Sequence, residues 1–241
     1  MADQPVAERL ARVRDRITEA CNRAQRPTDA VRLVAVSKRI PLPMVVEACR
    51  AGQWDLGENR VVEAVDRQPE LARLLTGAGL PAERLRWHFI GHLQSNKAGR
   101  AAGRFHMIHS VDSLKLAEKL SRLAVEEGRT ETILLEINIS GEAQKQGLAP
   151  DETREMVTRL ASLPGLEMKG LMGMAKFGSS ESELRSSFAS LRLLAEDART
   201  ATGLALPELS MGMSGDFEAA IAEGSTLVRI GGAIFGPRMT G

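Results

Sequence analysis

The chain has 241 residues and a formal net charge of +1, so its charge gives no argument for a nucleic acid or a membrane surface as partner. Its 43% hydrophobic and 26% charged residues are typical of a soluble globular protein. No apolar run is long enough to cross a bilayer, and residues 1–10 lack the apolar core of a secretory signal. Cys21 and Cys49 have neither metal-ligand spacing nor a disulfide pattern. We therefore expect a cytoplasmic protein with a single domain over residues 1–241.

The first half of the chain alternates helical patterns with short apolar runs. An amphipathic helix over residues 5–26 precedes residues 31–36, which are typical of a buried parallel strand. The elements expected next are helix 43–51, a short strand from Trp54, helix 61–75, strand 85–91, short helix 95–103, strand 105–110 and a helix to Glu127 capped by Asp112.

The second half continues the alternation. Its expected elements are strand 132–138, helix 150–163, strand 166–172, helix 181–202, strand 208–211, helix 216–223 and strand 226–230. Eight strands that are each followed by a helix or helical turn predict an α/β fold of the (β/α)8 TIM-barrel type, with one extra N-terminal helix. A doubly wound open sheet is the alternative, but no GxGxxG motif follows the first strand.

Lys38 lies directly after the first predicted strand, at the strand's carboxyl end. Barrel enzymes place their chemistry at this end. A lysine beside an apolar wall loses its proton more easily than one in water, and a neutral amine can form a Schiff base with an aldehyde. A solvated loop lysine is the alternative interpretation of this segment.

The loops after the last two strands carry features of a phosphate site. Barrels often bind phosphate there, and Ser214 offers a hydroxyl while Gly231 and Gly232 let backbone N–H groups approach an anion. Glycines that only make tight turns are the alternative. An aldehyde-directed Lys38 and a phosphate cradle across one barrel mouth together suggest pyridoxal 5′-phosphate (PLP), with Arg229 near its ring nitrogen.

Several longer segments, in order along nearly the whole chain, resemble one known family. They are VAVSK ending at Lys38, LGENR at 56–60, WHFIGHLQSNK at 87–97, INIS at 137–140, GLM at 170–172 and SMGMSGDFEAAIAEGSTLVRIGGAIFG at 210–236. Each is weak alone, but together they are highly specific. On these segments the chain resembles the YggS/PROSC family, the pyridoxal phosphate homeostasis proteins.

The resemblance implies a barrel of the alanine-racemase N-terminal type that holds PLP. The cofactor-binding residues that it implies are Lys38, Asn59, Ser214, Arg229, Gly231 and Gly232. Two segments depart from the family pattern. Arg39-Ile40-Pro41 replaces the usual Thr-Lys-Pro after the lysine, and the tail at 236–240 lacks the usual tyrosine, so the tail should pack differently.

Three features favour a cofactor carrier without robust catalytic activity. Arginine stays protonated, so Arg229 would leave the ring nitrogen unprotonated and the cofactor a weaker electron sink. Racemisation needs an acid/base group on each face of its intermediate, and the sequence has no tyrosine for the second face. No second domain is expected that would close over the ligand and exclude water. We therefore expect a PLP homeostasis protein that buffers or delivers PLP.

Two enzymatic alternatives remain open, namely a PLP-dependent amino-acid racemase and a Schiff-base aldolase acting on a phosphorylated sugar. Lys145, in the polar loop after the fifth strand, is a candidate second amine for transient capture, although a solvated surface lysine is the commoner situation. Delivery would bring transient contact with PLP-dependent apoenzymes. We expect a monomer with no nucleic-acid, membrane or metal partner.

Overall fold

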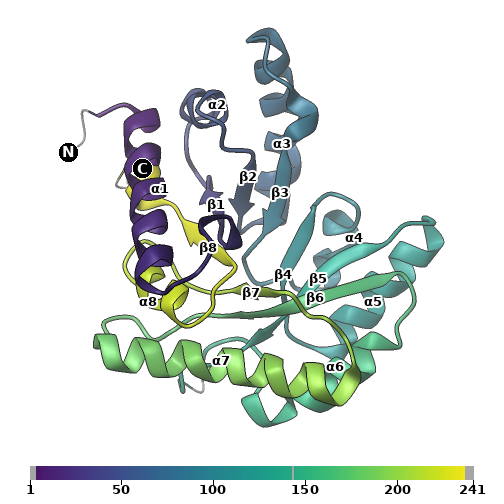
Figure 1. The fold of residues 1–241 in the computed structure, drawn as a ribbon. Coiled ribbons are helices and arrows are strands. Elements are labelled where there is room, and N and C mark those ends of the chain that lie inside the picture. The colour runs from purple at the N-terminus through teal and green to yellow at the C-terminus, as the bar shows by residue number, and fades with distance from the viewer. Residues whose placement is uncertain (1–3, 143, 237–241) are drawn as a thin grey trace.

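Eight parallel strands close into a barrel in which neighbours follow chain order, in a computed structural model that describes residues 4–142 and 144–236 (Figure 1). The strands are β1 Arg32–Val36, β2 Asp55–Glu58, β3 Arg86–Phe89, β4 Met107–Val111, β5 Glu131–Ile137, β6 Leu166–Gly173, β7 Glu208–Ser210 and β8 Leu227–Ile230. Pairing of Val34 with Arg229 joins β1 to β8 and closes the ring. The barrel prediction is confirmed, and the open-sheet alternative is wrong.

Helices follow the strands and cover the outside of the barrel. They are α1 Val6–Arg23, α2 Leu42–Arg50, α3 Val61–Gly77, α4 Ala98–Ala101, α5 Leu114–Glu126, α6 Thr153–Ala161, α7 Glu181–Thr202, α8 Phe217–Ala222 and α9 Gly232–Phe235, with single 3-10 turns at Thr28–Ala30, Ala82–Arg84, Ser95–Lys97 and Pro150–Glu152. The extra helix α1 buries Leu10, Val13 and Ile17 and packs beside α8 and α9 (Figure 1).

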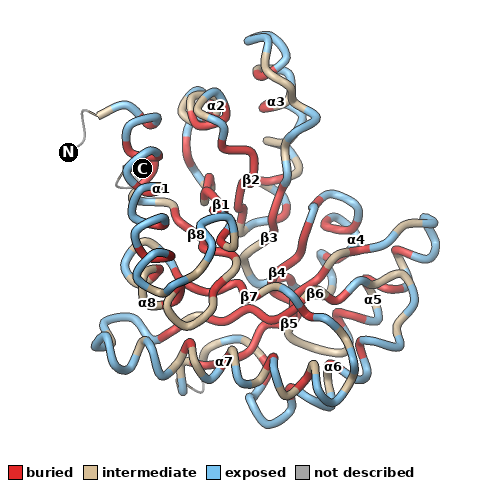
Figure 2. Tube along the Cα trace, viewed as in Figure 1, coloured by how far each residue is buried: buried red, intermediate tan, exposed pale blue. Residues whose placement is uncertain are grey.

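The strands are largely buried, and the helices and loops around them carry most of the exposed residues (Figure 2). Successive residues of a strand pack in two different environments. Leu33 and Ala35 belong to the large apolar cluster between the strands and the helices, whereas Val34 belongs to a separate small cluster. Because successive side chains of a strand point to opposite faces, this small cluster fills the barrel interior. Its members are Val34, Met107, Leu134, Met172 and Leu227.

Some local predictions at helix starts and ends differ from the structure. Asp112 does not cap α5: Ser113 occupies that position, and the Asp112 carboxylate lies 3.1 Å from His92 Nδ1, which competes for it. The helices expected over residues 95–103 and 150–163 both begin as 3-10 turns, and they end at Ala101 and Ala161. Most of the tail segment with the missing tyrosine lies in residues 237–241, outside the described residues. Among the helices that are described, none has the length and apolar character to cross a membrane.

Candidate functional site

A cavity of about 530 Å3 opens at the carboxyl ends of the strands, around β1, β7 and β8 and the loop after β6 at residues 174–179. Its lining includes five of the six predicted site residues, which are Lys38, Ser214, Arg229, Gly231 and Gly232. We call it the mouth cavity. Residues that are nearly 200 positions apart in the sequence meet there because β1 pairs with β8.

A strained turn carries Lys38 over the mouth cavity. Ile40 N–H donates to the Ser37 carbonyl at 3.0 Å, and Arg39 has a φ of 60°, in the left-handed region that non-glycine residues rarely adopt. Ser37 Oγ donates to Glu58 Oε1 at 2.8 Å and so fastens the turn to β2. Burial raises the pKa of Glu58, while the Ser37 hydrogen bond and the charges of Arg67 and Lys38 oppose the rise.

The loop after β7 is compact and holds Ser214 at the mouth. Gly212 has a φ of +93°, and a Cβ on it would lie 2.7 Å from Ala220 Cβ, so this position requires glycine. Met213 N–H donates to Asp216 Oδ1 at 2.5 Å, which closes the loop around Ser214. Asp216 therefore organises the loop rather than only starting α8, a role that the sequence analysis missed.

The two glycines after β8 have different roles. A Cβ on Gly231 would lie 3.2 Å from both Cβ and the carbonyl oxygen of Val36, so glycine lets the end of β8 approach β1 closely. A Cβ on Gly232 would meet nothing within 4 Å, so its backbone faces open space. The helical hydrogen bonds of α9 begin with Ile234 N–H donating to Gly231 O at 2.9 Å, which leaves the N–H groups of the first turn for an anion.

Arg229 is 3% exposed and is held by two hydrogen bonds at the inner end of the mouth cavity. Its Nη1 donates to Ser210 Oγ at 2.6 Å, and its Nη2 donates to the Gly173 carbonyl at 3.1 Å. Burial lowers the pKa of Arg229 to about 10, against the opposing effects of Glu136 and Asp216. The guanidinium is thus fixed in place and still charged at neutral pH.

Glu136 is a buried carboxyl near this guanidinium that the sequence analysis also missed. It occupies an inner position of β5, two residues after the interior residue Leu134. Burial raises the pKa of Glu136 to about 7; Asp112 adds to the rise and Arg229 opposes it. The signal in the sequence was a charged residue at an inward position of the apolar run at residues 132–137.

Two candidate residues lie elsewhere. Asn59 follows β2 and is not among the described residues that line the mouth cavity, so its place near a cofactor stays a prediction. Its backbone packs tightly on Gly91, where an added Cβ would lie 2.3 Å from Asn59 O. Lys145 forms an ion pair with Glu142 in the loop after β5, beside a neighbouring cavity that Asn138 also lines.

The mouth cavity fits PLP in three respects that the structure provides. It offers an amine at Lys38, open backbone space for a phosphate at Gly232, and a fixed, buried guanidinium that can donate a hydrogen bond to an unprotonated ring nitrogen. These groups come from the ends of β1 and β8, which pair with each other, so one ligand could contact all of them at once.

Comparisons with known proteins agree in sequence and in fold. The family described as "Alanine racemase, N-terminal domain" matches residues 9–239. Pyridoxal phosphate homeostasis protein of Pseudomonas aeruginosa is 43% identical over 97% of this chain and 96% of its own length, and that of Escherichia coli K12 is 41% identical over 97% of each.

Solved structures give the same result. PipY of Synechococcus elongatus, solved with PLP bound, superposes with a TM-score of 0.82 at 41% identity and covers 96% of this chain and 100% of its own. Alanine racemase of Clostridium difficile shares the fold, with a TM-score of 0.69 at 15% identity over 94% of this chain and 58% of its own. The chain therefore belongs to the alanine racemase N-terminal domain family and, within it, to the pyridoxal phosphate homeostasis proteins.

Proposed function

We propose that this protein binds PLP, holds it as a Schiff base on Lys38, and buffers or delivers it inside the cell. The observation that carries the proposal is that one cavity is lined by all of the following residues: Lys38, Ser214, Arg229, Gly231 and Gly232. The relatives of known name and the PLP-bound PipY structure support the same ligand. We further propose that the chain acts as one domain and as a monomer, and that delivery involves transient contact with PLP-dependent apoenzymes.

Each group of residues has its own task in this proposal. Lys38 supplies the amine that holds the aldehyde carbon, and the turn at Arg39 keeps that amine over the cavity. Ser214 and the first-turn N–H groups at Gly232 hold the phosphate. Arg229 donates a hydrogen bond to the ring nitrogen. When bound, the cofactor supplies an electron-withdrawing aldehyde and ring.

The same residues favour holding over catalysis. Because the pKa of Arg229 is about 10, the guanidinium keeps its proton at neutral pH and leaves the ring nitrogen unprotonated, which weakens the cofactor as an electron sink. A racemase also needs a second acid/base group, and the sequence has no tyrosine to provide one. We therefore propose that the protein has no robust catalytic activity.

We expect the purified protein to show a violet absorption band that Lys38→Ala abolishes. A Schiff base between PLP and a lysine absorbs in the violet, and borohydride reduces it to a stable secondary amine. Borohydride should remove the band of the wild-type protein and fix the cofactor on the peptide that contains Lys38. Absorption spectra before and after reduction, followed by peptide mass spectrometry, measure both effects.

Lys176→Ala is the matched control, because Lys176 lines the same cavity and the substitution is the same. This variant should keep the violet band. A band that survives Lys38→Ala but disappears in Lys176→Ala would show that the Schiff base forms on Lys176, which would contradict the role proposed for Lys38. A wild-type protein that stays colourless with added PLP would contradict the ligand itself, and the site should then be tested with sugar phosphates.

Proton exchange at the α-carbon of amino acids separates the carrier from the racemase. We expect L-alanine and other amino acids incubated with the protein in heavy water to lose their α-proton NMR signal no faster than they do with free PLP. The reason is that an unprotonated ring nitrogen makes the cofactor a weak electron sink, so the α-carbon does not readily lose its proton. Exchange at catalytic rates that requires Lys38 would favour the racemase instead.

A further inference from the structure

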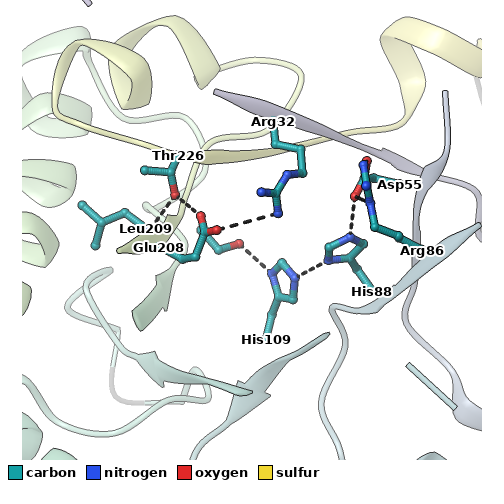
Figure 3. Close-up of polar contacts among 9 residues, drawn as sticks. Arg32, Asp55, Arg86, His88, His109, Glu208, Leu209 and Thr226 are labelled. Carbon is teal, nitrogen blue, oxygen red and sulfur yellow. Dashed lines mark hydrogen bonds and ion pairs between the residues drawn. The ribbon is translucent and has the colours of Figure 1, made fainter. Parts of the chain in front are cut away.

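A line of hydrogen-bonded side chains crosses the barrel interior (Figure 3). Asp55 Oδ1 lies 3.0 Å from His88 Nε2, and His88 Nδ1 lies 2.9 Å from His109 Nε2. His109 Nδ1 lies 2.8 Å from Ser210 Oγ, which accepts a hydrogen bond from Arg229 Nη1 at 2.6 Å. All five residues are buried and come from five different strands. We call them the interior relay.

The interior relay joins the two ends of the barrel. Asp55 is the first residue of β2, at the amino end, where Arg86 Nε and Nη2 donate to its two carboxylate oxygens at 2.8 and 2.5 Å. Asp55 and Arg86 line a second cavity, of about 510 Å3, at that end. Arg229 lies further along β8 and lines the mouth cavity at the carboxyl end.

The hydrogen bonds of the relay all run in one direction. Arg229 can only donate, so Ser210 Oγ accepts from it and has its own proton left for His109 Nδ1. A neutral His109 that accepts at Nδ1 carries its proton on Nε2 and donates it to His88 Nδ1. A neutral His88 then donates its Nε2 proton to Asp55, which can only accept when ionised.

The charge states of the groups fit this direction. Burial lowers the pKa of His88 despite its bond to Asp55, and burial together with the charges of His88 and Arg229 lowers the pKa of His109 further. Burial would raise the pKa of Asp55, but hydrogen bonds from Arg86 and His88 outweigh it and hold that pKa well below its usual range. Both histidines are therefore neutral at neutral pH, and the aspartate is ionised.

Further charged and titratable groups face the relay from neighbouring elements. His106 lies edge-on to His88, with 5.5 Å between ring centroids, and Arg32 adds a positive charge beside the two relay histidines. Glu136 and Asp216 act on Arg229. These surrounding charges leave the order of donors and acceptors within the relay unchanged.

We propose that His109 and Ser210, aligned through His88 by Asp55, are positioning residues that hold Arg229 toward the ring nitrogen of the bound ligand. A fully satisfied buried network is rigid, and a guanidinium fixed before binding loses less conformational freedom when the ligand arrives. The proposal rests on the proposed function for its ligand, but the direction of the relay depends only on the protein.

Nitrogen NMR of the imidazole side chains tests the direction without any cofactor. His88 and His109 should both appear as the neutral form with the proton on Nε2, unchanged between about pH 7 and 8. A proton on Nδ1 of either ring, or a charged ring in this range, would overturn the relay. If the tautomers are as expected and the wild-type protein is colourless with PLP, the proposed function fails while the relay stands.

His109→Leu tests the positioning of Arg229 from two links away. His109 is not among the described residues that line the mouth cavity, so the variant changes no group there. We expect the Kd for PLP to rise about five- to tenfold, as for a weakened hydrogen bond to a charged group. We also expect the pH midpoint of the violet band to rise by about half a unit, because a looser guanidinium withdraws less charge from the ring.

His109→Asn and His92→Leu are the matched controls. Asparagine can place its oxygen near the position of His109 Nδ1, accept from Ser210 and so restore the Kd to within about twofold. His92→Leu makes the same change at a histidine paired with Asp112 outside the relay and should alter neither quantity.

Ser210→Ala and Ser210→Thr test the same idea should His109→Leu not fold. The alanine should raise the Kd and the pH midpoint, and the threonine, which keeps the hydroxyl, should restore both. The positioning role is overturned if folded Ser210→Ala, with a melting temperature near that of the wild type, keeps the wild-type Kd and pH midpoint.

Discussion

Gly170→Ala is expected to lower the free energy of unfolding by about 3 kcal/mol or more, a melting-temperature decrease on the order of 6–12 °C for a chain of this size. Gly170 pairs with Glu208 of β7, and an added Cβ would lie 1.8 Å from the Glu208 carbonyl oxygen. A backbone oxygen in a paired strand cannot rotate away, so β6 and β7 would have to separate. Thermal unfolding followed by circular dichroism measures the decrease.

Gly99→Ala is the matched control for this prediction. Gly99 lies in α4, and a Cβ there would meet nothing within 4 Å. Because alanine is the better helix former, this variant should be as stable as the wild type or more stable by about 0.5–1 kcal/mol. A Gly170→Ala protein that melts within about 2 °C of the wild type would show that β7 can move away without cost.

The fold and five of the residues that line the mouth cavity could be predicted from the sequence because both depend on local patterns, whereas the loop after β6 that completes the lining was not predicted. Alternation of apolar strands and amphipathic helices is visible in the sequence, and eight repeats favour closure. Lys38, Ser214 and the glycine pair each follow a strand, and parallel strands present their carboxyl ends at one face. Knowing the strand ends was therefore enough to bring these residues together, whereas the details of their contacts required the structure.

The contacts inside the barrel could not be predicted in this way. Whether His109 meets Ser210 depends on the tilt of β4 and β7, which are not neighbours, and whether His88 meets His109 depends on the register of β3 and β4; no local pattern specifies either. A single histidine in an apolar run, such as His109, has many possible partners in the sequence alone. The capping prediction for Asp112 was wrong for a related reason, since His92 reaches that carboxylate from another loop.

Glu136→Gln is expected to remove a pH-dependent contribution to stability. Between about pH 4.5 and 8, the unfolding free energy of the wild type should fall by roughly 3 kcal/mol relative to that of the variant. The pKa of Glu136 is about 7 in the folded protein and 4.5 is its ordinary value. A raised folded pKa contributes stability below pH 4.5, and that contribution is lost as pH rises through 7. The wild type should therefore lose stability relative to the glutamine variant across this range. Urea unfolding of the cofactor-free proteins at several pH values measures the difference.

The comparison needs a second Glu→Gln variant, because glutamine also changes hydrogen bonding. Glu118 is exposed on α5, so Glu118→Gln should give a curve that runs parallel to that of the wild type. A difference between Glu136→Gln and the wild type that stays flat from pH 4.5 to 8 would mean that Glu136 keeps an ordinary pKa. A sloping difference would place a titrating carboxyl beside Arg229 near neutral pH. The charge that balances this guanidinium would then depend on pH in the range where the protein has to bind or release its ligand.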